Sequence, residues 1–135
     1  MGEHITRKYE EKYKNKIEEL LAESTHALAW GENASQSYLA IQNKQVIGIA
    51  SLSSNTYHPN REYLGVYIKP DFRRHGIGSK LFSELDSVSE QAKFQITLSS
   101  KEEVGLSFLK PLGFKLVRKS FFYFYNWLHY SFLLY

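Results

Sequence analysis

The segment that most constrains the fold is a glycine-containing turn between a strand-like run and an amphipathic helix. Residues from Tyr63 to Phe72 lead into this turn with a strand-like pattern. Apolar residues then recur at helical spacing, namely Ile77, Leu81, Leu85, Val88 and Ala92. A strand, a tight turn and a helix in this order favour an α/β chain in which helices pack on a sheet.

The turn itself has the chemistry of a phosphate site. It reads Arg73-Arg74-His75-Gly76-Ile77-Gly78-Ser79-Lys80. Two glycines one residue apart let the backbone approach a ligand closely, while the following helix directs unpaired N–H groups and its positive dipole end at the same point. Three cations, Arg73, Arg74 and Lys80, suit a pyrophosphate better than a neutral ligand.

Two other phosphate motifs do not fit this turn. A dinucleotide fingerprint needs a third glycine at the position of Leu81, and a Walker loop needs a Gly-Lys-Ser/Thr end that is missing. The remaining alternative is a glycine-rich turn that only joins a strand to a helix.

The wider context carries a family resemblance. The stretch from Val66 to Phe82 resembles the acetyl-CoA-binding motif of the GNAT N-acetyltransferase superfamily, whose signature Arg/Gln-x-x-Gly-x-Gly/Ala is matched by Arg73, Gly76 and Gly78. The resemblance implies that acetyl-CoA is the co-substrate and that its pyrophosphate is bound by residues Arg73, Arg74, His75, Gly76, Ile77, Gly78, Ser79 and Lys80. It also implies that backbone N–H groups near Tyr67 and Ile68 hold the thioester carbonyl, where the family splays its central strands apart.

The downstream sequence has the same resemblance. A strand at Phe94 to Leu98 is followed by a helical segment from Glu102 to Leu112 and then by Gly113-Phe114, the pair that opens the next strand in this family. We therefore expect one GNAT-like domain over residues 1–135 of class α/β (α+β). Its mixed, mostly antiparallel sheet would have six to seven strands, with helices on both faces.

The other elements follow from periodicity and turn signals. We expect a first strand at Ile5 to Lys8, a helix whose apolar stripe starts at Tyr13 and which ends near Ser24, and a loop or second short helix at Thr25 to Ser35. Asn43-Lys44 is a hairpin signal between two strands. The expected strands are Ser37 to Ile41, Val46 to Leu52, Glu62 to Ile68, Phe114 to roughly Phe124, and Leu128 to Leu134.

The amino-acid composition excludes several kinds of function. The 135 residues are 43% hydrophobic, which suits one core, and the absence of cysteine excludes disulfides and thiolate catalysis. We expect a soluble, cytoplasmic protein without a membrane partner, because the start has no apolar signal core and no apolar run reaches about 18 residues. No metal site is expected, since the five histidines are scattered.

The charge pattern argues against a nucleic-acid partner. The formal net charge is only +3. The lysines from Lys8 to Lys16 alternate with glutamates from Glu10 to Glu19, which is typical of a solvated helix face. A small nucleic-acid-associated domain, suggested only by the pI of about 9.0, is the weakest of three functional hypotheses.

Acetyl transfer to an amine needs a base, a polarised carbonyl and a leaving thiolate. We take Glu62 as the base, because it stands eleven residues ahead of Arg73, the spacing that the resemblance to the histone-acetylating branch implies. His58 and Glu32 are weaker candidates for the base. The alternative for Glu62 is a solvated or paired carboxylate at the start of a strand.

The chain departs from the family at the leaving group. Leu109 stands where many members carry a tyrosine that protonates the CoA thiolate, and Glu102 replaces a frequent asparagine. A donor would then be Tyr125 or Tyr123, or the thiolate would leave unassisted. The favoured function is acetyl transfer to a primary amine of a small molecule or peptide, and the alternative is a non-catalytic acyl-CoA-binding or regulatory module.

The aromatic residues of the last fifteen positions have two interpretations. Large aromatics are favoured in half-buried strands, so Phe122, Phe124 and Phe132 are expected to pack on helices. Alternatively, Tyr123, Tyr125 or Trp127 lines an acceptor pocket or a homodimer contact. The acceptor pocket would otherwise come from the loops near Trp30 and Asn126.

Overall fold

The computed structural model describes residues 4–23, 29–54, 61–89, 93–99, 109, 111–122 and 127–134. The chain divides into two compact units. The first comprises Met1–Ser54 and Leu64–Glu90, and the second comprises Asn55–Tyr63 and Gln91–Tyr135. Strand β4 (Arg61–Ile68) contributes residues to both units.

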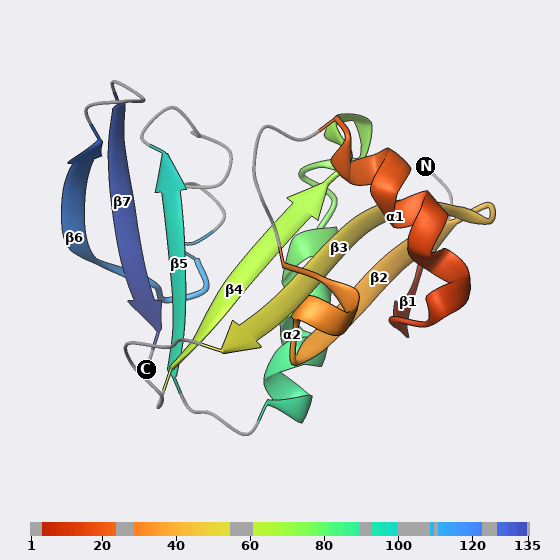
Figure 1. Ribbon diagram of the computed structural model, residues 1–135, viewed down its shortest axis with the longest axis horizontal. Coiled ribbons are helices and arrows are strands. Elements are labelled where there is room, and N and C mark those ends of the chain that lie inside the picture. Colours follow the sequence, from red (N-terminus) through yellow and green to blue (C-terminus); the bar gives the residue numbers. More distant parts are fainter. Residues whose placement is uncertain are drawn as a thin grey trace. The chain divides into compact units, whose positions relative to one another are not determined.

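The first unit is built on a sheet of strand order β1-β2-β3-β4 (Figure 1). Strands β1 (Ile5–Lys8), β2 (Gln36–Gln42) and β3 (Gln45–Ser54) pair antiparallel. Asn43 and Lys44 join β2 to β3 with φ angles of 50° and 65°. Left-handed values at both central residues are those of a type I′ turn, whose twist matches the two strands. The hairpin expected at Asn43-Lys44 is confirmed.

Two helices cover opposite faces of this sheet (Figure 1). Helix α1 (Lys14–Leu21) follows a 3-10 turn, η1 (Glu11–Tyr13), and its buried Ile17 and Leu20 pack on the apolar residues of β2 and β3. Helix α2 (Ile77–Val88) lies against the other face. It buries Ile77, Leu81, Phe82 and Leu85. Further 3-10 turns are η2 (Gly31–Asn33) and η3 (Pro70–Phe72).

Edge strand β1 presents its alternate residues to the two faces. The Thr6 hydroxyl lies 3.2 Å from Oε1 of Glu84 in α2. Because side chains alternate along a strand, Ile5 and Arg7 point to the face that α1 covers.

The second unit contains β5 (Lys93–Ser99), β6 (Lys115–Phe122) and β7 (Trp127–Leu134), with the order β4-β5-β7-β6. β5 runs parallel to β4, while β7 pairs antiparallel with both β5 and β6. The mixed α/β architecture with mostly antiparallel pairing confirms the expected fold class.

Several boundaries differ from the expectations. The first helix ends at Leu21, and Ala22 and Glu23 form a turn; Ser24 lies outside the described residues. In the segment 25–35, the described part holds only the 3-10 turn η2. Residues 111–113 form a turn, so the last predicted helix stops before Leu112, and residues 101–108 lie outside the described residues. Val88, expected on the apolar stripe of α2, is 38% exposed because it lies in the last turn of the helix.

Candidate functional site

The route from β4 to α2 is fixed by short backbone hydrogen bonds. The N–H of Lys69 donates to the carbonyl of Ile47 on β3 at 2.8 Å, which anchors the end of β4. The 3-10 turn η3 then reverses the chain, closed by a bond of 2.9 Å from the Phe72 N–H to the Lys69 carbonyl. Pro70 begins this turn, where its fixed φ and missing N–H suit a first helical position.

Two residues of the turn adopt left-handed backbone conformations. Arg74 has a φ of 66° and Gly76 a φ of 78°. Such a φ is uncommon for a residue with a side chain and concentrates at functional sites. Gly76 is also the N-cap residue of α2, and a Cβ built on it would meet no heavy atom within 4 Å. The glycine is therefore required by its dihedral angle and not by crowding.

The first turn of α2 leaves its N–H groups available. No side chain caps the helix, and the first intrahelical bond, 3.1 Å long, joins the Lys80 N–H to the Gly76 carbonyl. The N–H groups of Ile77, Gly78 and Ser79 have no acceptor inside a helix at this position. They point, with the positive end of the helix dipole, to the space in front of Gly76.

Arg73 has a role in the turn that the sequence did not indicate. Its Nε donates a 2.8 Å hydrogen bond to the carbonyl of Ile68, and its guanidinium lies 5.4 Å from the ring centre of Tyr67. The side chain thus ties the start of the turn back to the end of β4. An arginine suits this position because one planar group both donates and stacks.

Four of the other predicted phosphate-binding residues have exposed side chains, whereas the side chain of Ile77 is buried and only its backbone could meet the ligand. Arg74, His75, Ser79 and Lys80 all face solvent, so they are available to an anion. His4 lies near Lys80, a neighbour that the sequence pattern did not reveal. Burial, together with the charge of Lys80, lowers the pKa of His4 below its ordinary value of 6.5.

The predicted base lies on the same strand as the turn's anchor. Glu62 is buried, with 8% of its surface exposed, and it stands opposite Phe94 in the parallel pairing of β4 with β5. Burial of a carboxylate is unusual and marks a functional group or a partnered one. A solvated Glu62 is therefore wrong, whereas a paired carboxylate, the other part of that alternative, agrees with the burial and with the interaction that Glu62 makes. Tyr125, Tyr123 and His58 lie outside the described residues, as does the side chain of Glu32.

Two other residues that the sequence analysis singled out, Leu109 and Trp30, pack against the hydrophobic interior. Leu109 is 1% exposed, so the residue at the family's tyrosine position is a core side chain. Trp30 packs against the core cluster of α1 and meets the Tyr9 ring edge-on, with ring centres 6.0 Å apart. Asn126, the other predicted contributor to an acceptor pocket, lies outside the described residues.

Two features are absent from the described part of the chain. No group of three or more acidic, histidine or cysteine side chains there could hold a metal ion. None of its helices combines the length and hydropathy needed to cross a membrane.

A model of the acetyltransferase (GNAT) family matches residues 2–114, which is most of the chain. The chain belongs to the GNAT family. The resemblance to this family, which was inferred from Arg73, Gly76 and Gly78 in the turn between β4 and α2, is confirmed. A search of curated proteins gave no significant match.

Solved structures with the same fold agree with this assignment. An N-acetyltransferase from Staphylococcus aureus matches with a TM-score of 0.80 and 14% identity over 98% of both chains. A putative streptothricin acetyltransferase from Bacillus anthracis, solved in complex with acetyl coenzyme A, matches with a TM-score of 0.80 and 13% identity over 99% of both chains. A chain of the NatC complex bound to Gag peptide and CoA matches with a TM-score of 0.80 and 18% identity over 98% of both chains. At these identities the likeness establishes the fold.

Proposed function

We propose that this GNAT chain transfers an acetyl group from acetyl-CoA to a primary amine of a small molecule or peptide. The observation that carries the proposal is the uncapped start of α2, placed behind a left-handed Gly76 and beside exposed cations. This arrangement presents N–H donors and positive charge to a pyrophosphate at one point. The B. anthracis neighbour, which was solved in complex with acetyl coenzyme A, supports this choice of ligand.

In the proposed complex the pyrophosphate oxygens accept hydrogen bonds from the N–H groups of Ile77, Gly78 and Ser79. Arg74 and Lys80 add charge from the exposed side of the turn, whereas Arg73 acts by holding the turn to Ile68. The peptide-like pantetheine arm then lies along β4 as an added strand, with backbone N–H groups near Tyr67 and Ile68 holding the thioester carbonyl.

The chemical step is direct attack by the amine. Glu62 takes a proton from the acceptor ammonium, directly or through water, and the amine nitrogen attacks the thioester carbon. The new C–N bond forms as the C–S bond breaks, and the nitrogen releases its second proton to solvent. The thiolate takes a proton from solvent or from Tyr125, which solvent then reprotonates. Buried Leu109 has no proton to give. An unassisted thiolate is a fair leaving group because the pKa of an ordinary thiol is about 8.5.

The acceptor class and the cellular setting are part of the same proposal. Among the neighbours, the NatC complex is bound to a Gag peptide and the putative streptothricin acetyltransferase is named for a small molecule, so both acceptor classes are part of the proposal. We place the enzyme in the cytoplasm, since a chain without cysteine has no need of an oxidising compartment. Homodimerisation is part of the same proposal; because β7 is paired on both edges, with β5 and β6, the contact would use the edge strand β6 or a face of the sheet.

The proposal is tested in two stages. Calorimetric titration should show acetyl-CoA binding at low salt, and CoA release should then appear with one member of a panel of polyamines, aminoglycosides, amino acids and peptides. Binding without CoA release by any of these acceptors would favour the alternative, a non-catalytic acyl-CoA-binding module. Absence of binding would remove both functions.

The role of Glu62 is tested with a matched pair of variants. Glu62→Gln should lower turnover by about a hundredfold or more, the usual contribution of a general base, while acetyl-CoA affinity is retained. Glu18→Gln makes the same change on the exposed surface of α1 and should leave turnover unaltered. Normal turnover in Glu62→Gln would eliminate Glu62 as the base.

A further inference from the structure

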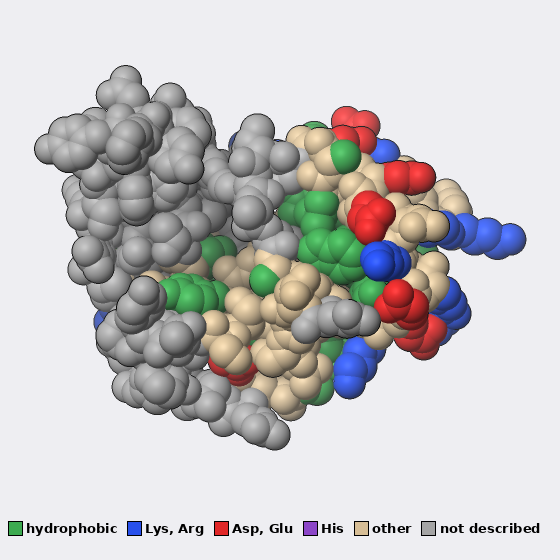
Figure 2. All heavy atoms as spheres, in the orientation of Figure 1, with side chains coloured by type: hydrophobic (Ala, Val, Ile, Leu, Met, Phe, Trp, Pro, Cys, Tyr) green, Lys and Arg blue, Asp and Glu red, His purple; other side chains and the backbone are tan. Residues whose placement is uncertain are grey.

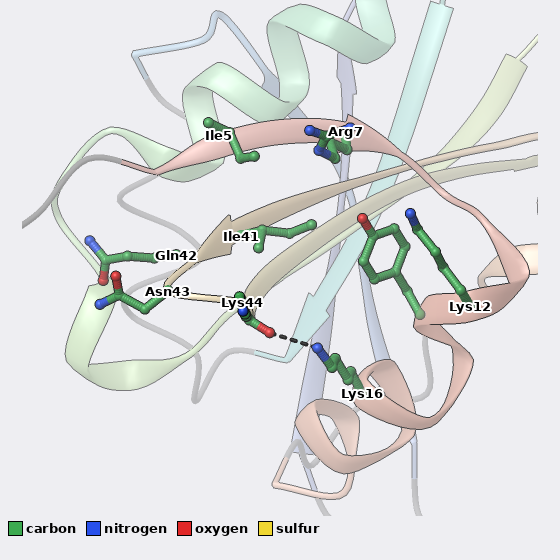
Figure 3. Close-up of a pocket in the computed structure, with 9 residues that line it drawn as sticks. Ile5, Arg7, Lys12, Lys16, Ile41, Gln42, Asn43 and Lys44 are labelled. Carbon is green, nitrogen blue, oxygen red and sulfur yellow. Dashed lines mark hydrogen bonds between the residues drawn. The ribbon is translucent and has the colours of Figure 1, made fainter.

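A hollow lies on the face of the first unit that α1 covers, away from the glycine turn. Its volume is about 550 Å³, and it is formed by β1, the η1–α1 segment and the β2–β3 hairpin (Figure 3). A volume of this size is ordinary for a small-molecule site. Because α2 and its phosphate turn belong to the opposite face of the sheet, this hollow is distinct from the proposed acetyl-CoA site.

The rim of the hollow is cationic. Four basic side chains line it, Arg7, Lys12, Lys16 and Lys44, and none of the lining residues is acidic. Figure 3 shows that they come from three different elements and surround one space. Four positive charges around one small hollow attract an anion with several charges.

Hydrogen bonds hold part of this rim in place. Lys16 donates from Nζ to the backbone carbonyl of Lys44 at 2.7 Å, which ties α1 to the hairpin turn (Figure 3). Lys12 lies 5.2 Å from the ring centre of Tyr13 and pairs with Glu10 at 3.3 Å. The hydrogen bond with Glu10 raises the pKa of Lys12, and the Glu10 carboxylate offsets part of the charge that Lys12 brings to the rim. Arg7 is exposed on β1, so its guanidinium can turn to a ligand.

Apolar side chains provide the second part of the hollow. Ile5 on β1 is 49% exposed, which is high for a large aliphatic residue, and the better buried Ile41 lies beside it in the lining. Tyr13 adds an aromatic ring. A ligand that covered Ile5 and stacked on Tyr13 would need a flat or apolar portion beside its charged groups.

We propose that this hollow binds a small phosphate-bearing molecule with a planar portion, the chemistry of a nucleoside polyphosphate. The four cations meet the phosphates, and Ile5, Ile41 and Tyr13 receive the ring. A nucleic-acid polymer fits less well, because its recognition needs cations along an extended track. Over α1 and the hairpin, Figure 2 instead shows acidic side chains interspersed among the basic ones.

The test uses ATP as the probe and two variants of equal charge. Arg7→Gln with Lys16→Gln removes two rim cations. The control, Lys8→Gln with Lys14→Gln, removes two exposed cations from the same strand and helix that do not line the hollow. Each double variant lowers the formal net charge from +3 to +1. ATP affinity should fall about tenfold in the rim variant and by about twofold or less in the control, since contacts made directly to charged groups outweigh general charge effects.

Additional ligands and one further variant test whether ATP binds in the hollow itself. Adenosine and inorganic pyrophosphate should each bind more weakly than ATP, because each meets only one part of the hollow. Lys44→Asn, which keeps a residue tolerant of the left-handed φ of 65°, should weaken ATP binding without unfolding the hairpin. Acetyl-CoA affinity should be the same in both double variants. Lack of ATP binding, or equal losses in the rim and control variants, would each overturn the proposal.

Discussion

Replacing Gly76 by alanine separates the backbone conformation of the glycine turn from its packing. The residue has a φ of 78°, and an added Cβ meets no heavy atom within 4 Å. The cost is therefore the strain of an L-residue in the left-handed region, about 1–2 kcal/mol, without a clash. Alanine also restricts the unfolded chain, which offsets about 0.4–1 kcal/mol. The free energy of unfolding should thus fall by about 1 kcal/mol.

The loss can be measured by urea and thermal unfolding. A decrease of this size corresponds to a Tm about 4 °C lower for a domain of this length. Gly76→Asn is the matched variant, because asparagine tolerates the left-handed region better than alanine, and its loss should be smaller. Both variants add a side chain where the pyrophosphate approaches, so both should weaken acetyl-CoA binding whatever their stability.

The stabilities of Gly76→Ala and Gly76→Asn together test whether the left-handed backbone conformation is what requires glycine at this position. If Gly76→Ala were as stable as the wild type, or if asparagine were no better tolerated than alanine, the left-handed conformation at Gly76 would not be what requires glycine. The claim that a left-handed Gly76 positions the start of α2 would then be refuted.

Three further predictions follow from individual contacts. Arg73→Lys keeps the charge but loses the hydrogen bond from Nε to the Ile68 carbonyl. It should therefore lower the free energy of unfolding by about 1 kcal/mol and weaken acetyl-CoA binding. A lysine variant with wild-type affinity for acetyl-CoA would mean that only the charge of Arg73 matters. Leu109→Ala should cost about 2–5 kcal/mol in urea unfolding, as expected for a cavity in the core, and a loss well below that range would contradict its burial. The lowered pKa of His4 means that the unfolded state binds more protons below pH 6.5, so stability should fall as the pH drops through that value. His4→Gln should flatten this part of the stability profile, and an unchanged slope would refute the assignment.

Local signals in the sequence were sufficient for most of the fold. The first strand, Ile5–Lys8, has its predicted bounds, and the hairpin at Asn43-Lys44 forms where a two-residue turn was expected. These features depend on neighbouring residues only, which is why periodicity and turn chemistry predict them. Helix ends are harder, because the last turn competes with other backbone bonds. The first helix accordingly stops at Leu21 and Val88 is exposed.

The glycine turn could be predicted as a motif but not as a set of contacts. Turn chemistry and the family resemblance together led us to propose Arg73 and Gly76 as part of a phosphate turn. The bond from Arg73 to the Ile68 carbonyl depends on how η3 reverses the chain, and no sequence pattern encodes that direction. In the same way, Lys12 and Lys16 matched a solvated helix face, and only the folded hairpin brings Lys44 to them.

The most direct test of the central claim is the change in backbone amide NMR signals when acetyl-CoA is added to the labelled protein. The largest shifts should occur at the amides of Ile77, Gly78 and Ser79, whose N–H groups face the proposed pyrophosphate. The shifts should saturate with the calorimetric affinity and disappear in Gly76→Ala at the same ligand concentration. Binding that left these three amides unchanged, or no binding at all, would contradict the assignment of the glycine turn as the acetyl-CoA site.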